Sequence, residues 1–180
     1  MKRIAYLFLL SLCFGFFNLT HAQSSIAWSK DYQLKWSDFQ AEPDLEIIAY
    51  ANTVYKIEIL PTNVAVDAQN NIQNYQAITA TAFFFKNLSW VYKEDDSLLV
   101  HEQLHFDIAE LHARKIRTEF EKLKKQKIAN FNSYSAAYAR VWEACLQMQR
   151  LYDQETNHGI IVEENKRWEK KISKLLDEAE

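Results

Sequence analysis

The sequence predicts an α+β fold, in which a small antiparallel sheet is followed by a long antiparallel helix hairpin and a C-terminal helix. Three observations support this class. Short segments typical of strands lie between residues 51 and 91, an uninterrupted helical pattern covers residues 97–127, and two further helical patterns follow it. Because the strands come first and the helices come afterwards, the order favours α+β over an alternating α/β fold.

The strand region contains two clear patterns and one weaker one. Apolar and charged residues alternate from Tyr55 to Ile59, which is typical of a half-buried strand. Residues 77–85 are rich in Thr and Phe and predict a longer strand, which could pair with an extended substrate. Val64–Val66 suggests another short strand. The connections are too short for helical crossovers, so we expect antiparallel pairing.

One long helix is predicted from about Ser97 to Lys127. Its apolar residues recur at spacings of three, four and five, as on an amphipathic helix, and no Gly or Pro interrupts them. Asp95–Ser97 supply N-cap oxygens and negative charge for the first turn. A short turn centred between residues 130 and 131 then leads to a second helix that ends near residue 155. A third helix covers residues 163–179.

The segment His101-Glu-Gln-Leu-His105 lies in the long helix and fits the pattern H-E-x-x-H. The two histidines share one helix face about 6 Å apart along the axis, and they can bind one zinc ion at about 2.0–2.1 Å each. Glu102 lies beside them, where its carboxylate can accept a proton from water. The alternative is two solvent-facing histidines on an ordinary helix. We predict a zinc site with Glu102 as the general base.

A catalytic zinc site usually has three protein ligands and leaves a fourth position for water. The extended pattern H-E-x-x-H-x-x-G-x-x-H fails, because Ile108 replaces its glycine and Leu111 its third histidine. His112 lies about 10.5 Å beyond His105 along the axis, too far for the same metal, and is expected to be a surface or packing residue. Glu110 lies about 140° around the helix from that histidine. We expect Glu110 to be structural or to support a ligand from behind.

Hairpin geometry offers a third ligand. Helices joined by a short turn run antiparallel, and the predicted turn places position 103, midway between the histidines, opposite about position 158. His158 occupies that position, and Gly159, the only glycine after residue 22, allows a sharp turn or a close approach of another chain. The alternative is that His158 and Gly159 merely cap the helix. We predict His158 to be the third zinc ligand.

Tyr152 and Asp153 precede His158 by one to two helical turns. Tyr152 can donate a hydrogen bond to an oxyanion, which would give it a catalytic role, although a tyrosine at a helix end is often only a packing residue. Asp153 can orient a ligand histidine from behind.

The motifs together resemble those of the bacterial predicted secreted zinc-dependent proteases, a family long filed as a domain of unknown function. The resemblance covers nearly all of the chain after residue 22. Its blocks are Leu34-Lys-Trp-Ser-Asp-Phe39, Ser89-Trp-Val91, His101-Glu-Gln-Leu-His-Phe-Asp-Ile-Ala-Glu110 with Ala113-Arg114, and Tyr152-Asp-x-x-Thr-x-His-Gly159. The resemblance implies a secreted zinc-dependent protease.

The N-terminus has the pattern of a secretory signal peptide. Two basic residues precede the apolar run Ile4–Phe17, and small residues follow it. The run is too short to span a bilayer comfortably. We therefore expect residues 1–22 to be cleaved, leaving residues 23–180 as a single domain with no stable membrane span, exported to the periplasm or secreted. An uncleaved anchor is the alternative.

The remaining chain would carry 19 basic and 24 acidic residues, a net charge of −5. Since no basic stripe is present, we expect no nucleic-acid partner. The leading function is an exported zinc-dependent hydrolase, a peptidase acting on peptide or protein substrates. The alternative is a zinc-stabilised envelope protein without turnover that binds a partner. A structural site of that kind would have four protein ligands.

Overall fold

The computed structural model describes residues 24–47 and 49–179. The expected signal peptide and its cleavage site lie outside these residues. Strands come first and helices follow, so the predicted α+β class is confirmed. The elements are β1 Ser25–Ala27, β2 Ala51–Asn52, β3 Tyr55–Leu60, β4 Thr79–Phe85, β5 Trp90–Val91, α1 Asp96–Lys125, α2 Phe131–Thr156 and α3 Val162–Glu178.

Among the described residues the strands form two antiparallel sheets, one in the order β1-β4-β3 and one that pairs β2 with β5. The strand β4 is central, because Phe84 pairs with Ile26 on one side and with Tyr55 on the other. Residues 83–85 of β4 are thus covered on the β1 side, whereas residues 79–81 pair only with β3 among the described strands. The expectation that substrate pairs with this strand stays a prediction. The segment predicted as a strand at Val64–Val66 forms only one bridge, between Val66 and Ile72.

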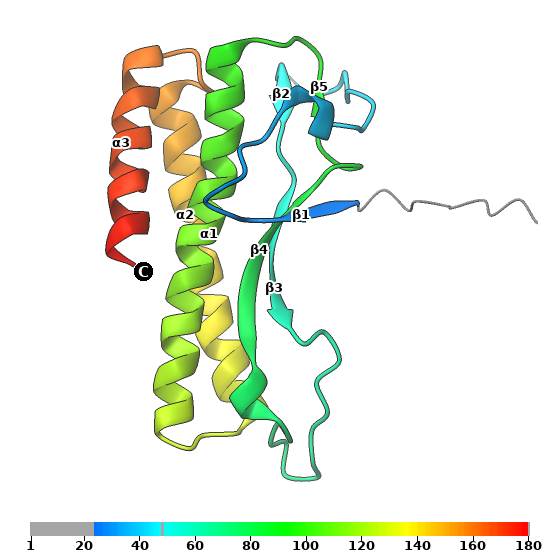
Figure 1. Ribbon diagram of the computed structural model, residues 1–180, viewed down its shortest axis with the longest axis vertical. Coiled ribbons are helices and arrows are strands. Elements are labelled where there is room, and N and C mark those ends of the chain that lie inside the picture. Colours follow the sequence, from blue (N-terminus) through cyan, green and yellow to red (C-terminus); the bar gives the residue numbers. More distant parts are fainter. Residues whose placement is uncertain (1–23, 48, 180) are drawn as a thin grey trace, which may run out of the picture.

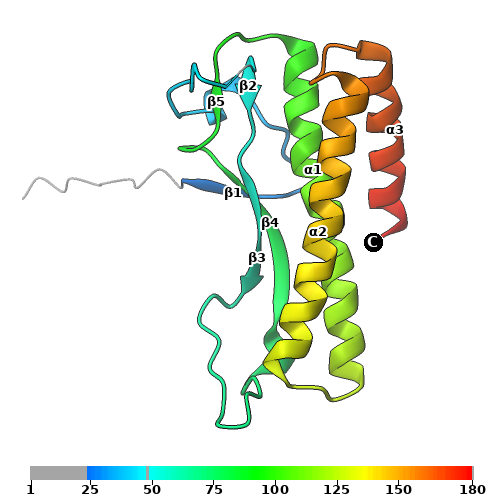
Figure 2. The ribbon, with the colours of Figure 1, turned by 180° about the vertical axis from the view of Figure 1, so that it is seen from behind.

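The helices α1 and α2 lie next to the three-stranded sheet, and α3 packs on the side of this pair that faces away from the sheet, as Figures 1 and 2 show. The helix α1 is the central element, because it contacts α2, α3, β3 and β4. Alternate residues of β4, namely Ala80, Ala82 and Phe84, are completely buried, and the phenyl ring of Phe84 lies 6.0 Å from that of Phe106 in α1. Burial of this apolar face holds α1, and the motif it carries, in a fixed position.

The caps of α1 and α2 follow from local chemistry. The Asp95 carboxylate accepts hydrogen bonds from the backbone N–H groups of Ser97 and Leu98 at 2.9 and 3.2 Å, as expected for an N-cap. The helix α2 starts at Phe131 with Asn130 as its N-cap. The turn between the two helices therefore covers residues 126–130 and centres on residue 128, two to three residues before the predicted centre.

Glu110 was predicted either to be structural or to support a ligand from behind, and its contacts are structural. It is buried, and its Oε1 accepts hydrogen bonds from Arg114 Nε at 3.0 Å and Arg117 Nη2 at 2.8 Å. Arg117 also donates to the carbonyl oxygen of Ala80 in β4, and Arg114 to that of Leu176 in α3. One carboxylate thus links α1 to the sheet on one side and to α3 on the other.

His112 and Cys145 are packing residues. His112 is 1% exposed, and its Nδ1–H donates to the carbonyl oxygen of Ile108 at 2.8 Å. His112 was predicted to be a surface or a packing residue, and the structure places it in the interior. Cys145 is completely buried, and burial raises the pKa of its thiol to about 12. Within residues 24–47 and 49–179, none of the helices has the length and apolar character that crossing a bilayer requires.

Candidate metal site

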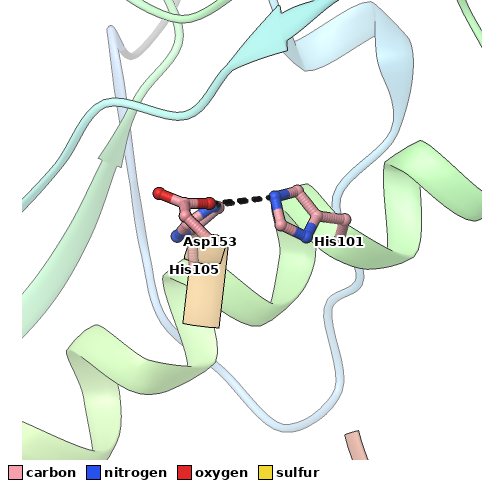
Figure 3. A group of neighbouring side chains, drawn as sticks. All are labelled: His101, His105 and Asp153. Carbon is pink, nitrogen blue, oxygen red and sulfur yellow. Dashed lines mark hydrogen bonds and ion pairs between the residues drawn. The ribbon is translucent and has the colours of Figure 1, made fainter. Parts of the chain in front are cut away.

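Three side chains meet at one point near the open end of the α1–α2 hairpin. The Nε2 atoms of His101 and His105 lie 3.1 Å apart, and Asp153 Oδ1 lies 3.3 Å from the first and 3.1 Å from the second. The two histidines come from α1 and the aspartate from α2, as Figure 3 shows. These three residues form a candidate metal site.

The spacing of the three atoms fits a tetrahedral metal ion. Ligands at about 2.0–2.1 Å from a tetrahedral zinc ion lie about 3.3–3.4 Å from one another. The observed separations of 3.1, 3.1 and 3.3 Å are close to those of one face of such a tetrahedron. The side chains therefore need only a few tenths of an ångström of adjustment to hold the ion.

The hydrogen bonds behind the two rings fix which nitrogens face the site. His105 Nδ1–H donates to Gln149 Oε1 at 2.5 Å, and His101 Nδ1–H donates to Asn165 Oδ1 at 3.4 Å. A neutral imidazole has one N–H, so both Nε2 atoms then present lone pairs to the site. Two lone pairs and a carboxylate oxygen within 3.3 Å of one another repel unless a cation lies between them.

The pKa values of the site residues show the same demand for positive charge. Burial disfavours the charged form of His105, but the contact with the Asp153 carboxylate and the charge of Glu102 outweigh burial and raise the pKa of His105. Burial would raise the pKa of Asp153, yet its contacts with His101 and His105 hold the pKa of that carboxyl well below its ordinary value. The carboxylate is thus kept ionised, which is the form that binds a metal.

The structure groups Asp153, and not His158, with the two histidines. The earlier turn explains this difference. Moving the centre of the hairpin from between residues 130 and 131 to residue 128 moves the position opposite the motif by about five residues, from about 158 to about 153. His158 lies beside the group, with Nδ1 3.6 Å from Asp153 Oδ1 and most of its side chain exposed. Its assignment as a zinc ligand stays a prediction.

Gly159 has the two properties predicted for it. Its φ is +80°, and a Cβ atom placed on it would lie 2.9 Å from Cγ of His101. It follows Asn157 and His158, whose φ values of 48° and 53° are also left-handed. Three such residues in a row reverse the chain after α2, and the missing side chain of Gly159 lets this turn lie against the His101 ring.

Residues 67–159 match the model of a family described as "Bacterial protein of unknown function (DUF922)". The match covers more than half of the 180 residues. The chain belongs to the DUF922 family. Neither the curated proteins nor the solved structures searched gave a match.

A cleft of about 920 Å³ opens above the candidate metal site of the DUF922 chain and is lined by all three site residues. Glu102 lines it as well, although only 4% of this residue is exposed. Thr53 Oγ1 donates to the Glu102 carbonyl oxygen at 3.4 Å and so joins the end of β2 to the motif helix. The predicted base therefore lies at the floor of the cleft, beside the ligands.

Tyr152 is completely buried and is not among the described residues that line the cleft. Its ring stacks on the His101 ring with centroids 4.6 Å apart, and its hydroxyl donates to Asn165 Oδ1. Burial, followed by the nearby charge of Glu102, raises the pKa of the hydroxyl. These contacts suit the packing role that was the alternative for this residue.

Two residues that support the ligands carry no motif and were missed by sequence reasoning. Gln149 holds His105 twice, since its Nε2 also donates to the His105 carbonyl oxygen at 2.8 Å. Asn165 is 4% exposed and lies in α3, beyond the end of the DUF922 match. Asn165 precedes Trp168 and Ile172 at helical spacing, so a polar residue on the buried stripe of α3 was the available signal.

Proposed function

We propose that the DUF922 chain is an exported zinc-dependent hydrolase that cleaves peptide bonds. The observation that supports it most is the convergence of His101 Nε2, His105 Nε2 and Asp153 Oδ1 at separations close to those of a zinc tetrahedron, at the floor of an open cleft. Two imidazoles and a carboxylate are the ligand types of known catalytic zinc sites. A fourth position would remain for water or substrate.

In this proposal His101, His105 and Asp153 hold the zinc ion, which when bound supplies a Lewis acid that polarises a carbonyl and lowers the pKa of water. Glu102 accepts a proton from the attacking water and donates it to the leaving amine. Gln149 and Asn165 keep both imidazoles in the tautomer that presents Nε2 to the metal. The acceptors behind both rings are neutral amides, so the ligands retain little negative charge beyond that of Asp153.

One observation favours the alternative of a zinc-stabilised binding protein without turnover. His158 Nδ1 lies 3.6 Å from Asp153 Oδ1, so this exposed side chain could supply a fourth ligand. Four protein ligands would close the site, as in structural zinc centres. The two candidates differ in turnover and in whether water can reach the metal.

The Glu102→Gln variant separates them. The change keeps the size of the side chain and should leave zinc content at one ion per chain, while turnover of a peptide library should fall by about 10²–10⁴-fold. Glu143→Gln, on the exposed surface of α2, is the matched control and should change neither quantity. Well under half an equivalent of zinc in the wild-type chain, or near-full turnover by Glu102→Gln, would contradict the mechanism.

Export is proposed from the N-terminal pattern. The mature protein isolated from its native host should begin at Gln23, which mass spectrometry of the intact chain can establish. A chain that retains residues 1–22 would support the uncleaved anchor instead.

A further inference from the structure

Large apolar side chains gather around the cleft although they are exposed to solvent. Leu45, Tyr50, Tyr92 and Ile160 all line it and are 80%, 54%, 63% and 65% exposed, respectively. A contiguous group of exposed apolar side chains beside a pocket marks a surface that a ligand covers. These residues come from the segments around β2 and β5 and from the turn after α2, so they surround the metal site on opposite sides.

The charges of the cleft are of one sign. Apart from the histidines, its charged lining residues are Asp44, Glu102 and Asp153, and no Lys or Arg is found among the described residues that line it. A terminal carboxylate or a phosphate group is normally recognised by Arg or Lys. Apart from a bound metal ion, the lining side chains therefore offer no cation to an anionic ligand, and their carboxylates repel acidic side chains.

The strand β2 offers a backbone edge beside the metal. Among the described strands it pairs only with β5, through Ala51 with Val91 and Asn52 with Trp90. Figures 1 and 2 both show β2 between β5 and α1, so its other edge faces the helix that carries the motif. Asn52 and Thr53 line the cleft there. An extended peptide can add to such an edge, with alternate side chains pointing into the cleft walls.

From these three observations we propose that the cleft binds an internal, extended stretch of polypeptide with bulky apolar side chains, laid along β2. The DUF922 chain would then cut within polypeptides at apolar sites and would not remove residues from a carboxyl terminus. The cleavage part of this inference rests on the proposed peptidase function, while the binding part does not. The apolar side chains of the substrate would cover Tyr50, Tyr92 and Ile160.

Binding can be measured without turnover on the zinc-loaded Glu102→Gln chain by titration calorimetry. The probe is a twelve-residue peptide, blocked at both ends, with leucine and tyrosine at alternate positions. A second peptide has glutamate at those positions, and a third has the apolar sequence with a free carboxyl terminus. We expect the blocked apolar peptide to bind at least about tenfold more tightly than the glutamate peptide, because one buried aromatic or aliphatic side chain alone is worth that factor. Freeing the carboxyl terminus should give no gain.

The double change Tyr50→Ser with Tyr92→Ser in the same chain should lower the affinity for the apolar peptide by about tenfold or more. Phe131→Ser is the control, since Phe131 is also exposed but lies at the start of α2, outside the cleft. Melting temperatures of all variants show that the fold is retained. Absent binding, equal binding of the apolar and glutamate peptides, or a preference for the free carboxyl terminus would overturn the inference.

The two proposals fail in different ways. If the wild-type chain digests a peptide library at sites without flanking apolar residues, the peptidase function is supported and the preference for apolar segments is refuted. If the Glu102→Gln chain binds the apolar peptide but the wild-type chain cleaves nothing, the peptidase function is refuted and the binding preference is supported.

Discussion

Replacing Asn165 by leucine should weaken zinc binding from outside the ligand set. Asn165 Oδ1 accepts hydrogen bonds from the Tyr152 hydroxyl and from His101 Nδ1, and all three groups are buried. Leucine keeps the branching of the side chain but is bulkier and has no acceptor. His101 would then be free to place its proton on Nε2, which removes the lone pair that binds the metal.

The structure gives the size of the effect. A buried donor left without an acceptor costs about 1–3 kcal/mol. The Tyr152 hydroxyl keeps the His101 carbonyl oxygen at 3.4 Å as an acceptor, so we expect a loss of about 1–3 kcal/mol in the free energy of unfolding. The lower part of this range is expected, because the 3.4 Å hydrogen bond from His101 is long. Loss of a residue that holds a ligand histidine typically lowers metal affinity by about 10–100-fold, which corresponds to about 1.4–2.8 kcal/mol.

Zinc affinity is measured by competition with a chelating dye, and a cobalt-substituted chain reports the geometry through its visible spectrum. Asn165→Asp keeps an acceptor oxygen at the same place and should retain zinc affinity within about threefold, which distinguishes orientation of His101 from general damage to α3. Lys166→Leu, one residue along the helix and exposed, should behave as wild type. A folded Asn165→Leu chain with unchanged zinc affinity and cobalt spectrum would refute the reasoning.

Three further changes test other parts of the structure. Asp153→Asn should lower zinc affinity, measured by dye competition, by more than the factor of about 10–100 expected for a supporting residue. His158→Gln should lower it far less. If His158→Gln had the larger effect, His158 would be the third ligand. Gly159→Ala should lower the urea midpoint by an amount equivalent to about 1–3 kcal/mol, because φ is +80° and the new Cβ would lie 2.9 Å from His101 Cγ; an unchanged midpoint would contradict this. Burial lowers the pKa of His112 from 6.5 to about 4. The unfolded chain therefore binds the extra proton between these values, and stability is lost as the pH falls through this window. His112→Leu should remove on the order of 3 kcal/mol of that loss in unfolding titrations at pH 4.5 and 7, and an identical pH dependence in the two chains would count against it.

The long helix and its motif could be predicted because their signals are local. Helical spacing, the Asp95 cap and the pair His101–His105 all lie within one continuous segment, and the structure differs from the prediction there by only one or two residues at each end. The class followed from the order of the elements. These features depend on neighbours in sequence, which a single sequence displays directly.

The third group and the supporting residues depend on register between distant segments. An error of two to three residues in the centre of the turn moved the position predicted to lie opposite the motif from about 153 to about 158, because reflection doubles the error. The pairing of β1 with β4 similarly brings residues near 25 beside residues near 85 and covers one edge of β4 at residues 83–85. Gln149 and Asn165 are neutral amides whose role exists only once the tertiary contacts are formed.

The candidate metal site lies at the end of the α1–α2 hairpin opposite its connecting turn, as Figure 1 shows for the two helices. A hairpin anchored covalently at one end is most easily opened at the other, where helix termini fray. A metal ion bridging His101 and Asp153 would cross-link α1 and α2 there. These residues are 52 positions apart, at the end of the hairpin farthest from the turn that joins the two helices. Metal removal would then let the start of α1 and the end of α2 separate, while the ends joined by the turn stay packed together. Amide hydrogen exchange in the last turns of α2 would thus report metal occupancy long before the protein as a whole unfolds.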